Sequence, residues 1–160
     1  MIELITTNER DDAIEAIGYA VARWQQAEEA FDIAVGERLG LGPSERICLA
    51  FLASGPKSAK QIGEEVRLTP AAITALLDRL EQRDLVRRLP DGRDRRKILV
   101  ALSKKAERIN REIYDPVAGD SRAVLRAFSL DELNTILRFV EQARSLQQKH
   151  ITRVGGRSKD

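Results

Sequence analysis

The chain has 160 residues, of which 42% are hydrophobic and 32% charged, and its formal net charge is +2. This length suits one domain or a small domain with extensions, and no apolar run reaches the roughly 18 residues that a membrane span requires. Cys48 is the only cysteine and His150 the only histidine, which excludes an intrachain disulfide and leaves too few soft ligands for a zinc site.

The small net charge hides two segments of opposite sign. Residues 1–40 hold three basic and nine acidic side chains, whereas residues 79–108 hold eleven basic and five acidic ones. The positive charge centres on RLPDGRDRRKILVALSKKA, residues 88–106. Because such a run is often only a solvated surface, its interpretation depends on the elements around it.

The N-terminal segment predicts one long helix. Its first residues lack the basic start and long apolar run of a signal peptide, so we expect a cytoplasmic protein. Apolar side chains then recur at spacings of three and four, which indicates a helix from about 10 to 38 with an acidic opposite face. The members of this apolar stripe are Ile14, Ile17, Val21, Trp24 and Phe31.

A second helix follows the segment GLGP at 40–43. Pro43 suits the first helical position, and the helix should run to about Ala53. Cys48 lies within its apolar run RICLAFLA. We therefore interpret Cys48 as a buried core thiol, with an exposed redox sensor as the alternative.

Two shorter helices come after a turn at 54–58. Ser58 and Gln61 have the spacing of a capping box, which opens a helix to about Val66. Thr69 followed by Pro70 again marks a helix start, here for PAAITALLDRLEQRD. One face of this helix is apolar and should pack, and it consists of Ile73, Leu76, Leu77 and Leu80. The opposite face begins with small residues, which would let the backbone approach a large flat partner such as a DNA groove.

The basic stretch itself predicts a hairpin. LVRRLP and KILVALS have the composition of short strands, and Asp91-Gly92 between them is a strong hairpin signal. A helix pair followed directly by a basic hairpin is the pattern of a winged helix-turn-helix, a mainly α fold with a small β wing. In that arrangement the second helix enters the major groove and the hairpin tip reaches the flanking minor groove.

Further helices are predicted toward the C-terminus. Ser103 should cap a helix that is interrupted at Asp115-Pro116 and resumes toward Phe128. Ser129 and Glu132 form another capping box. The last helix carries an apolar stripe made of Leu133, Ile136, Leu137, Val140 and Ala143. We expect the polar tail TRVGGRSKD to be disordered.

Together these patterns resemble the MarR family of winged helix-turn-helix transcriptional regulators over nearly the whole chain. The wing Asp94-Arg95-Arg96 followed by ILVALS matches the family's D-x-R and V-x-L-T, and LLDRLEQRDLVRR stands in place of L-x-D-x-L-E-x-x-G-L-V-x-R. Asp84 replaces the usual glycine, but aspartate tolerates the left-handed conformation, so the turn should survive. Ser103 replaces the usual threonine and can still cap a helix. Ala106 replaces a common glycine, and this change hardly affects the resemblance.

The resemblance implies a DNA interface with two parts. In the wing, Arg96 would contact the minor groove and Asp94 would orient it, while Arg93, Arg95 and Lys97 would attract phosphates. On the helix, the residues expected to face DNA are Thr69, Pro70, Ala71, Ala72, Thr74, Ala75 and Arg79. Arg79 would pair with a guanine edge or a phosphate, and the alanines would touch thymine methyl groups. Thr69 and Pro70 also serve as a plain helix start, and the two roles can coexist.

The resemblance further implies a homodimer on a pseudo-palindromic operator. The predicted organisation is a dimerisation helix at 1–40, a DNA-binding region at 41–103, dimerisation helices at 104–150 and a disordered tail at 151–160. Helices that pack within one chain are the alternative. The family also implies a pocket for a small aromatic or phenolic effector, which Trp24, Phe31 and Phe51 would line unless they are simply core or interface.

No cofactor and no enzymatic activity are expected. The sequence has no nucleophile–base pair, glycine-rich phosphate loop or metal-ligand spacing. The predicted partner is double-stranded DNA and not a membrane, and the predicted function is that of a ligand-responsive repressor. The competing hypothesis is a winged-helix module that binds protein, which would not need Asp94 and Arg96 in its wing.

Overall fold

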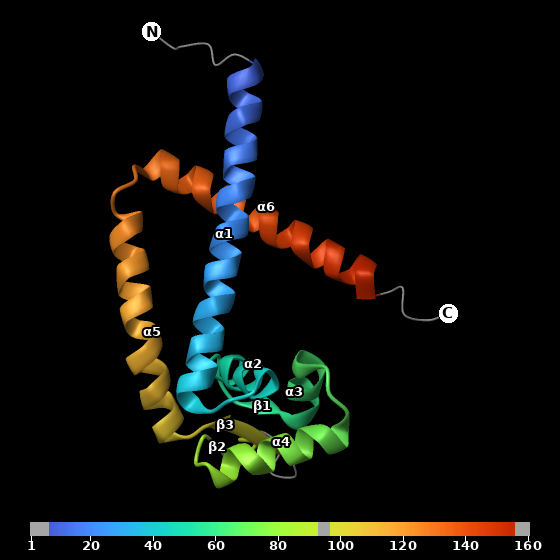
Figure 1. Ribbon diagram of the computed structural model, residues 1–160. Helices are drawn as coiled ribbons and strands as arrows, with labels where there is room; N and C mark the ends of the chain where they lie inside the picture. Colours follow the sequence, from blue (N-terminus) through green and yellow to red (C-terminus); the bar gives the residue numbers. More distant parts are fainter. Residues whose placement is uncertain (1–6, 93–96, 156–160) are drawn as a thin grey trace. The chain divides into compact units, whose positions relative to one another are not determined.

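The computed structural model of the chain describes residues 7–92 and 97–155, and it divides after Glu107 into two units (Figure 1). The elements in chain order are α1 (Thr7–Leu39), α2 (Pro43–Leu52), β1 (Lys57–Ser58), α3 (Ala59–Val66), α4 (Pro70–Gln82), β2 (Val86–Pro90), β3 (Ile98–Leu102), α5 (Lys104–Leu125) and α6 (Leu130–Gly155). The mainly α fold with a small β wing is confirmed.

The core of the first unit lies between helices α2, α3 and α4 and a small antiparallel sheet. Its most deeply buried side chains are Cys48, Ile62, Ile73, Leu76, Leu80 and Val100. They come from α2, α3, α4 and β3, so the apolar face predicted for the helix at 70–84 is the one that packs. Burying such side chains stabilises the fold by about 1.5–3 kcal/mol each before the cost of ordering the chain.

The sheet has the strand order β1-β3-β2. In the predicted hairpin, Val86 lies opposite Leu102 and Pro90 opposite Ile98. The third strand, β1, pairs Lys57 with Val100 in the segment for which the sequence predicted only a turn. Two residues are too few to show the alternation that identifies a strand, so its position depends on the tertiary contact with β3.

The predicted helix starts are confirmed in α3 and α4. Ser58 Oγ accepts a hydrogen bond from the backbone N–H of Gln61, while Gln61 Oε1 accepts one from the N–H of Ser58, at 3.3 and 2.9 Å. Thr69 Oγ1 accepts from the N–H of Ala72 at 3.4 Å. These caps satisfy amide groups that have no partner inside the helix.

Helix α1 belongs to the first unit and packs against α2 at its C-terminal end (Figure 1). Val35 and Gly36 are buried there, whereas side chains 8–34 are exposed apart from the half-buried Val21. The predicted apolar stripe is therefore largely uncovered in the single chain, with Ile14 59% and Trp24 57% exposed.

The second unit contains most of α5 and all of α6. The predicted interruption at Asp115-Pro116 is wrong, because α5 is continuous and carries Pro116 inside it. A proline in a helix removes one backbone hydrogen bond. The helix tolerates that loss here because the side chains around Pro116 are exposed, so water can reach the acceptor that lacks a partner.

Helix α6 begins with the predicted capping box and ends later than expected. Glu132 Oε2 accepts from both the N–H and the hydroxyl of Ser129, each at 2.7 Å, and these bonds hold the pKa of Glu132 below its usual value. The helix then continues to Gly155, so residues 151–155 are helical where the sequence predicted disorder. Polar composition alone did not reveal that a long helix would propagate this far.

Candidate nucleic-acid interface

The candidate interface begins with the tight connection between α3 and α4. Arg67 ends α3 in the left-handed conformation with φ of 58°, and the N–H of Leu68 donates to the carbonyl of Gly63 at 3.2 Å. The chain turns within three residues to Thr69, the cap of α4. This geometry joins two helices of one core as a helix-turn-helix.

Helix α4 has the two faces that the sequence predicted. Ile73, Leu76, Leu77 and Leu80 are buried. On the other side Ala72 is half-buried, and the exposed candidate residues are Thr69, Pro70, Ala71, Thr74, Ala75 and Arg79. The hydroxyl of Thr74 donates to the carbonyl of Pro70 at 3.0 Å, so it presents lone pairs outward rather than a free proton. The described part of the helix thus offers a low, mainly apolar surface on which a nucleic-acid groove can lie close to the backbone.

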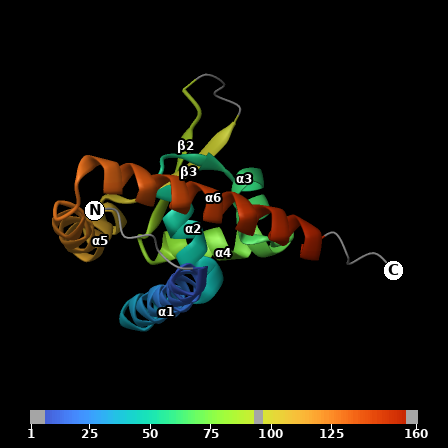
Figure 2. The same cartoon turned by 90° about the horizontal axis from the view of Figure 1, so that it is seen from above.

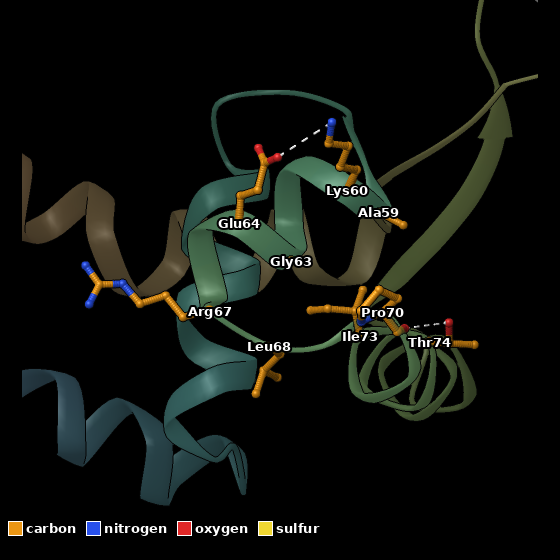
Figure 3. A pocket seen from close by; sticks show the side chains of 9 residues that line it. All are labelled: Ala59, Lys60, Gly63, Glu64, Arg67, Leu68, Pro70, Ile73 and Thr74. Carbon is orange, nitrogen blue, oxygen red and sulfur yellow. Dashed lines mark hydrogen bonds and ion pairs between the residues drawn. The ribbon is translucent and has the colours of Figure 1, made fainter. Parts of the chain in front are cut away.

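A groove of about 520 Å³ runs between α3 and the start of α4 (Figure 3). Pro70, Ile73 and Thr74 of α4 line one part of it, while Lys60 of α3 and Arg67, the residue after α3, add two cations. Lys60 Nζ lies 3.9 Å from Glu64 Oε1, and both side chains are mostly exposed. Lys60 and Arg67 could not be recognised as candidates from the sequence, because isolated basic residues at a short helix carry no distinctive spacing.

Arg79, a predicted DNA contact, has an acidic neighbour on α2. Its Nε atom lies 3.7 Å from Glu45 Oε1, yet the Arg79 side chain remains 59% exposed. An ion pair this open contributes only about 0–1 kcal/mol to stability. The pair therefore orients Arg79 and leaves much of its guanidinium accessible to a partner.

Arg88 at the base of the wing is committed to two carboxylates of α4. Its Nη2 atom donates to Asp78 Oδ1 at 2.6 Å, and its Nη1 atom pairs with Glu81. The hydrogen bond to Asp78 is the main reason that the pKa of Arg88 is raised, with the charges of both carboxylates adding to it. Arg88 thus ties β2 to α4. The motif LLDRLEQRDLVRR holds all three residues, so the sequence contained the signal but not their pairing.

Arg93, Asp94, Arg95 and Arg96 at the wing tip lie outside the described residues, so the minor-groove contact stays a prediction. The strands below the tip are described, and β2 and β3 project away from α2, α3 and α4 (Figure 2). At the base of the tip, the N–H of Asp91 donates to the carbonyl of Lys97 at 2.9 Å, and the Lys97 side chain is exposed.

The end of α4 is fixed by the segment that follows the wing. Ser103 Oγ donates to the carbonyl of Asp84 at 2.6 Å and accepts from the N–H of Ala106 at 3.0 Å. Asp84 has φ of 55°, as expected for the residue that stands in place of glycine. The predicted cap at Ser103 is therefore confirmed, and the same hydroxyl also holds the turn after α4.

Other chemistry finds little support in the described part of the chain. It contains no group of three or more His, Cys, Asp or Glu side chains able to hold a metal ion. Cys48 is fully buried, and burial together with the charge of Glu45 raises the pKa of its thiol to about 12. None of the described helices is long and apolar enough to cross a membrane.

Comparison with known proteins agrees with this geometry. A family model described as MarR family matches residues 39–97, from the end of α1 to the base of the wing. The HTH-type transcriptional regulator YcgE of Bacillus subtilis (strain 168) is 27% identical over 125 residues, which cover 78% of this chain and 81% of the relative. The HTH-type transcriptional repressor MdtR of the same organism is 28% identical over 117 residues, or 72% of this chain and 68% of the relative.

A solved structure shows a similar fold. The YusO protein from Bacillus subtilis superposes with a TM-score of 0.58 at 22% sequence identity, over 84% of this chain and 96% of that one. The agreement extends well beyond the segment matched by the family model, so the similarity includes helices outside the winged core.

Proposed function

The chain belongs to the MarR family of DNA-binding transcriptional regulators, and we propose that it is a ligand-responsive repressor that binds a pseudo-palindromic operator as a homodimer. The observation that carries this proposal is the exposed, small-residue face of α4 beside a basic hairpin. An enzyme site is not part of the proposal, since the matched relatives are transcriptional regulators.

The proposed DNA contacts are of two kinds. Helix α4 would lie in the major groove, where Ala71 and Ala75 contact thymine methyl groups and Arg79 binds a guanine edge or a phosphate. Arg96 at the wing tip would enter the minor groove, oriented by Asp94, with Arg93, Arg95 and Lys97 near phosphates. Because α4 has few side chains able to bind a base with two hydrogen bonds, much of the specificity would come from the shape of the DNA.

The proposed homodimer is supported by apolar surface that the single chain leaves uncovered. Ile14 and Trp24 on α1 are more than half exposed, and so are Leu137 and Leu146 on α6. Two subunits related by a twofold axis would bury such stripes and place two copies of α4 on successive turns of the major groove.

Repression and its release by a ligand are the finer part of the proposal. The relative MdtR is described as a repressor. A small aromatic or phenolic carboxylate would bind to the dimer and weaken its affinity for the operator. A DNA target also places the proposed site of action in the cytoplasm.

Selection of genomic DNA tests this proposal. The purified protein is mixed with fragments of its own genome, and the bound fragments are sequenced. We expect enrichment of a motif with twofold symmetry, and static light scattering should give the mass of two chains. Fragments without any shared motif, or a stable monomer at micromolar concentration, would contradict the proposal. Aromatic carboxylates are then screened for release of the selected DNA.

A further inference from the structure

The C-terminal end of α1 is joined to α4 by one arginine side chain. Arg83, the residue after α4, donates from Nη2 to the carbonyl of Leu39 at 2.6 Å and from Nη1 to the carbonyl of Gly40 at 3.0 Å. These acceptors lie more than forty residues earlier in the chain. A long helix and the candidate DNA-binding helix are therefore connected directly, without an intervening element.

The two carbonyls are available because of how α1 ends. Gly40 has a left-handed backbone with φ of +59°. The N–H of Leu41 donates to the carbonyl of Gly36 at 2.8 Å, and the N–H of Gly40 donates to the carbonyl of Glu37 at 3.2 Å. This Schellman motif satisfies earlier carbonyls and leaves those of Leu39 and Gly40 without a partner in the helix. A guanidinium suits them, since the C-terminal end of a helix carries partial negative charge.

Glu45 of α2 adds a second set of contacts at the same place. Its Oε2 atom accepts from the N–H of Gly42 at 2.9 Å and lies 3.8 Å from Arg83 Nη1, while its Oε1 atom lies 3.7 Å from Arg79 Nε. The Glu45 side chain is only 14% exposed, so its charge is poorly screened by water. We call Arg83, Glu45 and the two carbonyls the corner cluster. It joins the ends of three helices.

The length of α1 makes the angle at this corner important. The helix has 33 residues, which corresponds to about 50 Å, and its buried side chains are confined to the C-terminal end. A rotation of about 5° at the corner would move the far end of a rod of that length by about 4 Å. If partner subunits hold each other through α1, the corner cluster fixes how each α4 is presented relative to the dimer.

We propose that Arg83 is a positioning residue that couples α1 to α4 and thereby sets the half-site spacing that the dimer accepts. This inference rests on the proposed homodimer and its two-part operator. A twofold DNA-binding dimer requires a defined distance between its two recognition helices, because half-sites recur with the DNA helical turn. Arg83 acts on that distance without contacting DNA itself.

The test compares Arg83→Gln with a matched control, Arg38→Gln. Both substitutions remove one positive charge near the end of α1, but the Arg38 side chain makes no hydrogen bond or ion pair with any described residue. Arg83→Lys is the second variant. It keeps the charge and is less disruptive to folding, but one ammonium group cannot donate to both carbonyls in the same fork geometry.

Two readouts distinguish positioning from simple stabilisation. The first is the ratio of affinities for the selected operator and for a duplex with two base pairs inserted between its half-sites. The second is the width of the distance distribution between spin labels at Ala75→Cys on the two α4 helices, in a Cys48→Ala background without DNA. Circular dichroism confirms folding of each variant before either measurement.

We expect Arg83→Gln to lower the affinity ratio by about fivefold or more, because typical coupling between distant sites changes affinity by at least that factor. The same substitution should broaden the distance distribution between the spin labels. Arg83→Lys should show a smaller effect in the same direction, and Arg38→Gln should match the parent protein. An unchanged ratio and width in folded Arg83→Gln and Arg83→Lys would overturn the inference. A parent protein that ignores half-site spacing or shows no distance between subunits would instead overturn the proposed operator or dimer, and the coupling with it.

Discussion

Arg79, Arg83 and Arg88 lie close together in sequence, yet their partners give them different roles. Arg79 is oriented by Glu45 and stays largely exposed, Arg83 donates to the end of α1, and Arg88 is held by two carboxylates. Residues 79–108 therefore contain more basic side chains than are free to contact DNA. Only the exposed ones can release counterions from a duplex.

Cys48 should be unreactive in the folded protein. Its thiol is fully buried and its pKa is raised from 9.0 to about 12, so almost no thiolate exists at neutral pH. We expect a thiol-reactive disulfide reagent to modify Cys48 slowly until the chain is unfolded by urea, as followed by absorbance. Rapid modification of the native protein, or peroxide-induced release of DNA that is lost in Cys48→Ser, would contradict the core assignment.

The same pKa shift gives a pH dependence with a definite sign. Between 9.0 and about 12 the unfolded chain loses the thiol proton first, so this group's contribution to the free energy of unfolding is complete below pH 9.0 and declines as the pH rises toward 12. Urea denaturation of the parent and of Cys48→Ala over alkaline pH should reveal a steeper decline in the parent.

Gly36 is required by close packing at the corner of α1 and α2. A Cβ atom there would lie 2.9 Å from Arg46 Cδ and 3.0 Å from the carbonyl oxygen of Leu41. Gly36→Ala should therefore reduce the free energy of unfolding by about 1–3 kcal/mol, the usual cost of overpacking. Urea denaturation at fixed protein concentration measures the change.

Gly18 in the same helix is the matched control. A Cβ atom at Gly18 would meet nothing within 4 Å. Gly18→Ala should stabilise the protein by about 0.5–1 kcal/mol, because alanine loses less backbone entropy in a helix. Equal effects of the two substitutions would show that the corner is not tightly packed.

The elements differ in how well the sequence predicted them. The caps at Ser58, Thr69 and Ser129 and the hairpin could be predicted because local spacing and turn chemistry determine them. Strand β1 could not, since it exists only through pairing with β3. The continuity of α5 through Pro116 was also missed, because the sequence cannot show that an exposed helix will lose one hydrogen bond and continue.

The candidate site was predictable only in part. The buried and exposed faces of α4 followed from periodicity. The partners of Arg79, Arg83 and Arg88 did not, because pairs such as Arg83 and Leu39 are brought together by tertiary folding. The wing-tip residues Arg93–Arg96 remain a prediction from the motif.

The wing prediction is tested by Arg96→Ala. Loss of a contact in the minor groove should weaken operator binding by about 1–3 kcal/mol, whereas the fold should persist because a hairpin-tip arginine supports little packing. Asp94→Ala should give a milder loss, since it removes the orienting partner but also a negative charge. Fluorescence anisotropy measures the affinities, with circular dichroism as the folding control. Unchanged affinity in folded Arg96→Ala would rule out the wing contact.

At the level of the whole molecule, the described elements expose two different kinds of surface. The winged core from α2 to β3 offers a low apolar helix face with cations beside it, while α1, α5 and α6 leave apolar side chains exposed, including Ile14, Val124 and Leu137. Contiguous apolar surface of this kind usually marks an interface. In the function proposed above, α4 and the wing would bind DNA, and the long helices would form the subunit interface.

The proposed function requires that this chain bind a specific duplex through cations that replace counterions. This requirement can be tested by fluorescence anisotropy of the protein with its selected operator and with a scrambled duplex, over a series of salt concentrations. We predict tighter binding to the operator at every concentration, with the logarithm of its affinity falling linearly and steeply as the logarithm of salt rises. Equal affinity for the two duplexes, or an affinity insensitive to salt, would contradict the claim.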